Sequence, residues 1–246
     1  MSSGPWPYPR WIAHRGAGKL APENTLAAFR LGARHGYRMF ECDVKLSQDG
    51  VPFLMHDATL NRTTDGAGIG GANSWQQLSQ RDAGGWHSRQ YAGEPLPCLD
   101  NIAGFCRANG HHLNIEIKPT PGTEHYTGTI VAQRAAALWA GATIPPLLTS
   151  FDVAALEGAQ TSAPDLPRGL LLDTPRADWL AVAQRLHCVA VICHYSLWND
   201  ATVTAAHGAG LRCLSYTVND ESIAQHLLAL ETDGIITDRV DLFVPA

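Results

Sequence analysis

The sequence predicts an α/β protein built as a (β/α)8 TIM barrel, with a small insertion after the second barrel strand. From residue 99 onward, segments with a strand pattern alternate regularly with segments of helical periodicity. Such alternation is typical of a parallel sheet whose strands are joined by right-handed helical crossovers. Two more strand-like segments near the start of the chain bring the expected number to eight, and eight units in 246 residues favour a closed barrel over an open sheet.

Each expected strand is a short run rich in branched apolar residues and bounded by turn residues. In chain order the eight barrel strands are expected at 11–13, 40–46, 113–117, 146–150, 168–172, 189–194, 211–218 and 234–237. Helices are expected between them, for example at 129–140 and 221–230, where apolar residues recur every three or four positions. Between the first two strands, Asn24 is the expected N-cap of a helix that continues to about His35.

The stretch between the second and third barrel strands interrupts this alternation. The sequence Gln-Asp-Gly at 48–50 predicts a tight turn, after which residues 52–55 are expected to return as a short strand beside the second barrel strand. The glycine-rich residues 57–98 follow. An irregular segment of this length is more often functional than incidental, so we expect an insertion over the mouth of the barrel, within a single catalytic domain spanning residues 1–246.

Composition narrows the class of protein. The net charge of −5 offers no basic surface for nucleic acid. No apolar run approaches the length of a membrane span, so we expect no stable membrane association. The six cysteines lack the spacing of zinc or redox motifs and are expected to be small buried hydrophobes. These features favour a reduced, cytoplasmic protein, and they leave its oligomeric state open.

Three carboxylates are candidates for one metal site. Side chains two positions apart on a strand share a face, so Glu41 and Asp43 are expected to point toward the barrel axis while Cys42 points outward. Glu116 has the same parity near the end of the next barrel strand. Carboxylates gathered at the carboxyl ends of barrel strands repel one another unless a cation lies between them. A set of oxygen ligands favours one divalent cation, Mg²⁺ or Ca²⁺, over zinc.

Four further side chains belong to the same ends of the predicted strands. They are His14, Arg15, His56 and Lys118. Imidazoles shuttle protons and fixed cations pair with phosphate charge, so the combination predicts metal-assisted chemistry on a phosphate ester. Each residue alone also has a structural interpretation, such as an ion pair between Lys118 and Glu116, but the seven residues together favour an active site.

Other titratable residues are expected to be structural. Four histidines are expected in loops or helices without carboxylate partners, namely His87, His125, His207 and His226. Asp233 and Asp238 flank the last strand, where we expect them to cap or turn the chain.

Taken in order, these motifs resemble those of the glycerophosphodiester phosphodiesterase family, over nearly the whole sequence. The hallmarks are His14-Arg15-Gly16, Pro22-Glu23-Asn24-Thr25, Glu41-Cys42-Asp43, His56-Asp57, Glu116-Ile117-Lys118, Ser150-Phe151, Thr217-Val218-Asn219 and Asp233-Gly234-Ile235. The chain looks closest to bacterial cytoplasmic members associated with glycerol-3-phosphate uptake, which it resembles in residues 19–28, 93–97, 114–119 and 167–173.

The resemblance implies metal-dependent hydrolysis of glycerophosphodiesters, such as glycerophosphocholine or glycerophosphoethanolamine, to sn-glycerol 3-phosphate and an alcohol. It also implies roles for single residues. The matching positions are Glu41, Asp43 and Glu116 for the metal ligands, His14 and His56 for the acid–base pair, and Arg15 and Lys118 for the phosphate contacts. Phe151 and Tyr216 are expected to line the substrate pocket, with Tyr216 in place of a common tryptophan.

Several alternatives stay open at this point. Either histidine can be the acid and the other the base. Our hypothesis is that the glycerol 2-hydroxyl attacks first and gives a cyclic phosphate, with direct attack by water as the other route. Two other functions compete, a lysophospholipase D-like lipid phosphodiesterase on the same barrel and a non-catalytic metal-binding scaffold. The mostly polar residues 57–98 favour small soluble substrates, and the two histidines and two cations argue against a scaffold.

Overall fold

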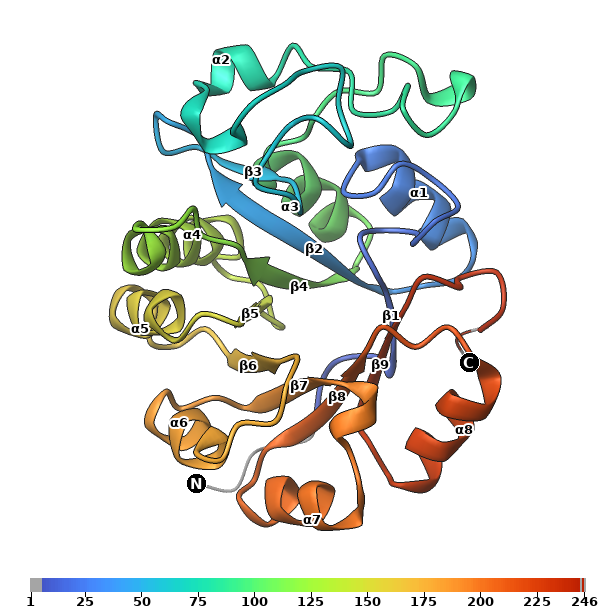
Figure 1. Ribbon diagram of the computed structural model, residues 1–246, viewed down its shortest axis with the longest axis vertical. Helices are drawn as coiled ribbons and strands as arrows, with labels where there is room; N and C mark the ends of the chain where they lie inside the picture. Colours follow the sequence, from blue (N-terminus) through green and yellow to red (C-terminus); the bar gives the residue numbers. More distant parts are fainter. Residues whose placement is uncertain (1–5, 244, 246) are drawn as a thin grey trace.

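Eight parallel strands close into a barrel in the computed structural model, which describes residues 6–243 and 245 (Figure 1). They are β1 (Trp11–Ala13), β2 (Met39–Leu46), β4 (His112–Ile117), β5 (Leu147–Ser150), β6 (Arg168–Leu172), β7 (Ala190–His194), β8 (Arg212–Tyr216) and β9 (Gly234–Thr237). The order around the barrel is β1-β9-β8-β7-β6-β5-β4-β2, and β1 pairs with β2 to complete the ring. The predicted TIM barrel is therefore confirmed.

Helices lie between the strands and cover the outer wall of the barrel (Figure 1). They are α1 (Leu26–Arg34), α3 (Leu99–Ala108), α4 (Glu124–Leu138), α5 (Val153–Ser162), α6 (Trp179–Arg185), α7 (Asp200–Gly208) and α8 (Glu221–Ala229). The helix expected at 129–140 is α4, which begins and ends earlier, and α8 ends one residue before its predicted end. Among the described helices, none is long and apolar enough to cross a membrane.

The register of the ladder sets which side chains share a level of the barrel. β2 and β4 run parallel, with Glu41 opposite Asn114 and Asp43 opposite Glu116. Cys42, between the two acidic residues of β2, packs outward in the apolar layer under the helices. Toward the amino end, the interior is filled by apolar side chains, namely Ile12, Met39, Leu147, Leu171, Ile192, Leu214 and Ile236. The polar groups of the barrel interior are therefore found at its carboxyl end, as is usual for this fold.

Several strand ends differ from the prediction by one residue, and two larger differences have a visible cause. The N-cap of α1 is Thr25, whose hydroxyl accepts a hydrogen bond from the first turn of the helix (3.3 Å). Asn24 instead has a φ of 59°, and its side chain is held by a tertiary partner in the barrel. β8 ends at Tyr216 rather than at residue 218, because its partner β7 ends at His194, directly opposite Tyr216.

The segment after β2 forms a short strand beside β2, as predicted. β3 (Pro52–Leu54) runs antiparallel to β2, with Leu54 opposite Val44. The segment 57–98 then forms two short 3-10 turns and α2 (Trp75–Leu78). It packs a small apolar cluster against β3, formed by Phe53, Met55, Leu60, Leu78, Ala83 and Leu96. Figure 1 shows the segment beyond the end of β2 and beside α1.

Candidate active site

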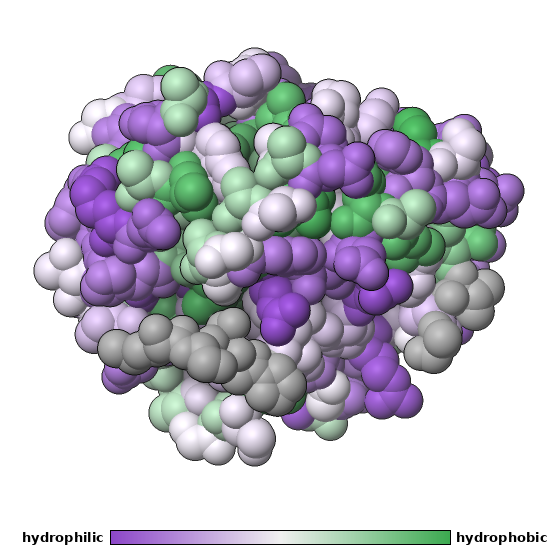
Figure 2. Space-filling view, turned by 90° about the horizontal axis from the view of Figure 1, so that it is seen from below, coloured by the Kyte–Doolittle hydropathy of each residue, from purple (hydrophilic) through white to green (hydrophobic). Residues whose placement is uncertain are grey.

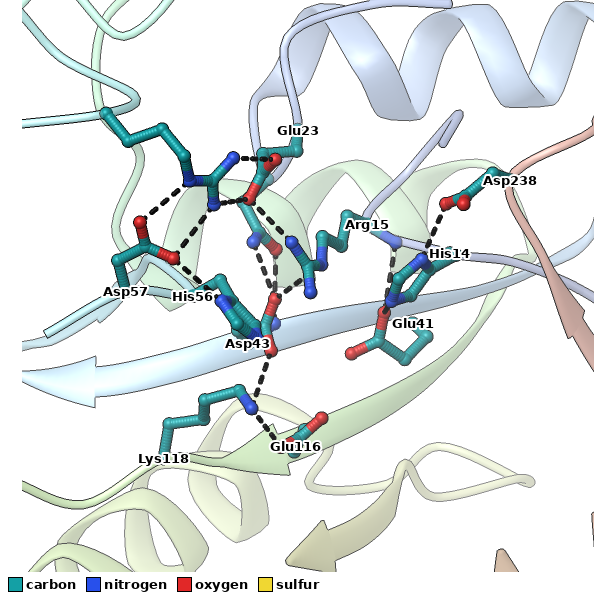
Figure 3. Close-up of polar contacts among 12 residues, drawn as sticks. His14, Arg15, Glu23, Glu41, Asp43, His56, Asp57, Glu116, Lys118 and Asp238 are labelled. Carbon is teal, nitrogen blue, oxygen red and sulfur yellow. Dashed lines mark hydrogen bonds and ion pairs between the residues drawn. The ribbon is translucent and has the colours of Figure 1, made fainter. Parts of the chain in front are cut away.

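The structure brings the three predicted carboxylates together at the carboxyl ends of β2 and β4 (Figure 3). One ligand oxygen from each of Glu41, Asp43 and Glu116 lies within 4.8 Å of the others. The three residues are only 3%, 1% and 9% exposed. Such a buried group of acids is costly unless its charge is neutralised.

The surroundings of the acid cluster fit a divalent cation. Glu41 Oε1 and Asp43 Oδ1 are buried and have no hydrogen-bond partner among the described residues. Burial and the charges of Asp43 and Glu116 raise the pKa of Glu41 well above its usual value. Burial and the Asp43 charge likewise raise the pKa of Glu116 to about 7. Glu41 therefore has both an unpartnered oxygen and a carboxyl that resists ionisation, and a hard cation bound here would partner that oxygen and ionise the group.

Asp43 differs from the other two acids because cations contact it. Arg15 Nε lies 3.3 Å from Asp43 Oδ2, and Lys118 Nζ lies 3.5 Å from Oδ1 and 2.6 Å from Glu116 Oε1. Burial alone would raise the pKa of Asp43, but the charges of Arg15 and Lys118 lower it to about 2. Asn24 Nδ2 also donates to Asp43 Oδ2 (2.8 Å), while the Asp43 backbone N–H donates to Asn24 Oδ1 (3.1 Å).

His14 lies between the acid cluster and the last strand of the barrel (Figure 3). Its Nδ1 is 2.7 Å from Asp238 Oδ1, and its Nε2 is 3.8 Å from Glu41 Oε2. The backbone N–H of Arg15 donates to the same Glu41 oxygen (3.0 Å). Nε2 of His14 therefore faces the acid cluster, while Nδ1 is held by Asp238.

His56 occupies the other flank of Asp43 and has a carboxylate of its own. Asp57 Oδ1 lies 2.8 Å from His56 Nδ1, and both Asp57 oxygens accept hydrogen bonds from Arg62 (2.7 and 2.9 Å). Burial lowers the pKa of His56, and Asp43 only partly offsets this. Arg62 also donates to Glu23, which in turn accepts a hydrogen bond from Arg15 (2.8 Å). The insertion thereby supports both His56 and Arg15.

The predicted substrate-pocket residues form an aromatic wall beside the cations. The ring of Phe151 packs edge-on against that of Tyr216, with centroids 5.8 Å apart. Lys118 Nζ lies 5.5 Å from the Phe151 ring centroid. Phe151 is 38% exposed, and the Tyr216 hydroxyl donates to the backbone carbonyl of Leu172 (3.1 Å).

Sequence reasoning missed several residues that contact this site. Asp238 was expected to cap or turn the chain, and Asn24 to cap α1, yet they bind His14 and Asp43. Glu23 lies within the motif Pro22-Glu23-Asn24-Thr25 but had no predicted role, and Arg62 lies in the segment 57–98, for which only a mostly polar character was predicted. The position of Asp238 one residue after β9 was the available signal, since the carboxyl ends of barrel strands meet at one rim.

The assignment of His207 was also wrong. His207 was expected to have no carboxylate partner, but its Nε2 lies 2.9 Å from Asp233 Oδ2. Asp233 also accepts hydrogen bonds from Arg212 Nη1 (3.0 Å) and from the backbone of Cys213 (2.8 Å). These contacts join the starts of β8 and β9, at the amino end of the barrel and away from the acid cluster. Because Asp233 is fully bonded, the group is a structural clamp.

Comparisons with known proteins agree with this geometry. A sequence model of the "Glycerophosphoryl diester phosphodiesterase family" matches residues 14–242. A glycerophosphodiester phosphodiesterase of Caldanaerobacter subterraneus subsp. tengcongensis is 30% identical over 95% of each chain. The structure is similar to that of an Oleispira antarctica phosphodiesterase in complex with the product sn-glycerol-3-phosphate, with a TM-score of 0.87 and 34% identity over 94% of this chain and 93% of that one. A glycerophosphodiester phosphodiesterase from Agrobacterium tumefaciens str. C58 has a TM-score of 0.80 and 27% identity, over 97% of this chain and all of that one.

Proposed function

The chain belongs to the glycerophosphoryl diester phosphodiesterase family and hydrolyses glycerophosphodiesters, and we propose that it does so with one divalent cation, Mg²⁺ or Ca²⁺, held by Glu41, Asp43 and Glu116. The products would be sn-glycerol 3-phosphate and an alcohol. The observation that carries the proposal is the buried acid cluster, in which Glu41 Oε1 has no hydrogen-bond partner and which His14, Arg15 and Lys118 contact directly. His56 lies beside Asp43 (Figure 3).

The chain's own residues would then bind the diester and move its protons. Arg15 and Lys118 would contact the phosphoryl oxygens, and the planar guanidinium of Arg15 suits two oxygens at once. One of His14 and His56 would take the proton of the attacking hydroxyl and the other would protonate the leaving alcohol. Phe151 and Tyr216 would form the wall against which glycerol lies. When bound, the cation would lower the pKa of a coordinated hydroxyl and offset phosphoryl charge.

We propose that residues 1–246 form one catalytic domain, with 57–98 as an insertion at the mouth of the barrel. The contacts from Arg62 to Asp57 and Glu23 support this assignment; residues 1–5, 244 and 246 lie outside the described chain. A cytoplasmic location is proposed on the six cysteines, all within the described residues, which are free thiols.

A second substrate class is favoured by an apolar pocket at the same rim of the barrel. The pocket has a volume of about 540 Å³ and lies between the loops that follow β6 and β7, where Trp179, Leu197 and Trp198 line it. It shares Leu172 and residues 174–176 with a groove that contains Phe151. Figure 2, a view of the molecule from below the orientation of Figure 1, shows apolar residues interspersed with hydrophilic ones on that face. The pocket suits the acyl chain of a lysophospholipid, cleaved at the same phosphodiester bond.

One assay separates these functions from a non-catalytic scaffold. Purified protein is incubated with glycerophosphocholine or with lysophosphatidylcholine, with and without a chelator, and choline release is measured. Cation-dependent release from glycerophosphocholine alone is the expected result. Release from the lysophospholipid at a comparable rate would support the second substrate class. Release that persists after complete chelation would contradict the proposed metal site. No hydrolysis of either substrate, nor of glycerophosphoethanolamine assayed by glycerol 3-phosphate release, would leave only the scaffold.

A further inference from the structure

We propose that Asp238 is a positioning residue that sets the tautomer of His14. We also propose that the hydrogen bond from Asn219 determines which group at position 238 faces His14. The inference rests on the proposed function for its kinetic consequence, but its structural part concerns only the tautomer of one imidazole. It starts from the 2.7 Å contact between Asp238 Oδ1 and His14 Nδ1.

The Asp238 carboxylate fixes the position of the proton on neutral His14. An ionised carboxylate only accepts hydrogen bonds, so Nδ1 must carry the hydrogen in this contact. Burial opposes ionisation of Asp238, but the hydrogen bonds from His14 and Asn219 hold its pKa below the usual value. The unprotonated Nε2 of His14 is then the nitrogen that faces Glu41 (3.8 Å) and the space where substrate would lie.

Asn219 holds the opposite side of Asp238. Its Nδ2 donates to Asp238 Oδ2 (2.9 Å), and its Oδ1 accepts from the Asp238 backbone N–H (2.9 Å). Thr237 Oγ1 lies 3.3 Å from the same Asn219 oxygen as a second donor. With two donors on Oδ1, the amide of Asn219 has one satisfactory orientation, and it presents a donor to Asp238.

This arrangement predicts a specific effect of Asp238→Asn. The new amide must turn its oxygen toward the Asn219 donor, so its NH₂ group faces His14 Nδ1. His14 must then accept at Nδ1 and carry its hydrogen on Nε2, which is the wrong tautomer for a base facing the substrate. In a catalytic triad, the equivalent change leaves the geometry intact but lowers kcat by about 10⁴-fold. We expect a fall of about 10²–10⁴ in kcat with KM little changed.

Exchanging the two residues should restore the tautomer. In the double variant Asp238→Asn/Asn219→Asp, the new carboxylate at position 219 accepts from the NH₂ group at position 238. The amide oxygen at 238 is then free to accept from His14 Nδ1. The backbone N–H of residue 238 and the Thr237 hydroxyl keep an acceptor at position 219, so each hydrogen bond has a partner. The net charge equals that of the wild type.

The experiment combines kinetics with ¹⁵N NMR of the histidine rings. Wild type, Asp238→Asn and the double variant are assayed with glycerophosphocholine in Mg²⁺. Their ring-nitrogen spectra are recorded at about pH 8.5, well above the reference pKa of a free imidazole. The His14 signals are identified by their loss in His14→Gln. Asp241→Asn is the control, because Asp241 is an exposed acid three residues away that pairs with Arg239; its kcat and His14 tautomer should match the wild type.

The expected result is an Nδ1–H tautomer in wild type, an Nε2–H tautomer with low kcat in Asp238→Asn, and recovery of both in the double variant. A single variant that keeps the Nδ1–H tautomer and a normal kcat would overturn the proposal, as would a folded double variant with the Nε2–H tautomer. If the single variant fails to fold, the tautomer of His14 in the double variant still tests the proposal. A wild type that hydrolyses no diester but shows this tautomer pattern would refute the proposed function and leave the positioning intact.

Discussion

At the scale of single residues, the site is a balance between buried negative charge and the groups that offset it. Arg15 and Lys118 are close enough to keep Asp43 ionised, so its pKa falls despite burial. Glu41 and Glu116 receive less compensation, and their pKa values rise. In the metal-free protein, Asp43 therefore ionises more readily than Glu41 and Glu116, and a bound cation would favour the ionised form of both glutamates.

The first prediction concerns stability against pH. Since the folded-state pKa of Glu116 is raised from 4.5 to about 7, the folded metal-free protein keeps a proton that the unfolded chain has released in this range. This stabilisation is complete below about pH 4.5 and is lost as the pH rises through about 7. A cation that binds ionised carboxylates offsets the loss, so the rise in Tm on adding Mg²⁺ or Ca²⁺ should grow between about pH 5 and pH 8.

Scanning calorimetry measures this effect. One cation concentration is used throughout; where it equals 100 Kd at pH 8, the stabilisation at that pH is about 2.7 kcal/mol, or about 5–10 °C for a chain of this size. Glu116→Gln removes the titrating group and should lose both the pH slope and most of the cation shift. An equal cation shift at pH 5 and pH 8 in the wild type would contradict this account.

The second prediction concerns the two imidazoles. His14→Ala and His56→Ala should each lower kcat by about 10²–10⁴-fold, because each removes a proton-transfer group at the site. Circular dichroism and Tm should show an intact fold. His207→Ala, at the amino end of the barrel, is the matched control and should retain the wild-type kcat. A near-normal rate in either site variant would remove that histidine from the mechanism.

At the scale of elements, loops after different strands supply the supporting contacts. The loop after β1 carries His14 and Arg15, the segment after β3 carries Arg62, and the end of β9 leads directly into Asp238. Close packing between the first and last of these loops holds the His14–Asp238 pair. A Cβ atom at Gly18 would lie 2.2 Å from the Asp238 Cα, and Gly18 has a φ of +58°.

The third prediction tests this close approach. Gly18→Ala should displace Asp238, costing about 1–2 kcal/mol for the positive φ and about 1–3 kcal/mol more for overpacking. It should also lower kcat. Gly36→Ala is the control, because Gly36 has a φ of +89° but open space around it, so only the first cost applies. Chemical denaturation and steady-state kinetics measure both effects; equal losses of stability in the two variants would refute the packing argument.

The fourth prediction concerns the insertion. Arg62 is half-exposed, so its ion pairs contribute about 1 kcal/mol or less to stability. It nevertheless orients Asp57 and Glu23, which hold His56 and Arg15. Arg62→Ala should therefore lower kcat about 10–100-fold, as is typical when the supports of site residues are removed, with a small change in Tm. Arg89→Ala removes a cation from the same segment and should leave kcat unchanged; similar kinetics in both variants would exclude this role.

At the scale of the whole molecule, the sequence predicted what depends on local pattern. Strand alternation predicted the barrel, and parity along β2 and β4 predicted that Glu41, Asp43 and Glu116 would share its interior. Contacts that form only when the barrel closes could not be predicted from the sequence. His14 and Asp238 are 224 residues apart in sequence and meet only because β1 pairs with β9.

Predictions from local sequence also failed where a side chain hydrogen-bonds a residue of another element instead of its own. Asn24 has a good capping side chain, but its hydrogen bonds to Asp43 on β2 replace the cap, which passes to Thr25. His207 likewise meets Asp233 through the packing of α7 against the starts of β8 and β9. Neither contact follows from spacing along the chain, since each joins separate elements of the barrel.

The central claim, that the carboxyl end of the barrel holds one cation between three acids, is tested most directly by soaking crystals in Ca²⁺ and recording anomalous scattering. We predict one strong peak with oxygens of Glu41, Asp43 and Glu116 at about 2.3–2.6 Å. A well-diffracting crystal at saturating Ca²⁺ with no peak among these three carboxylates would contradict the claim.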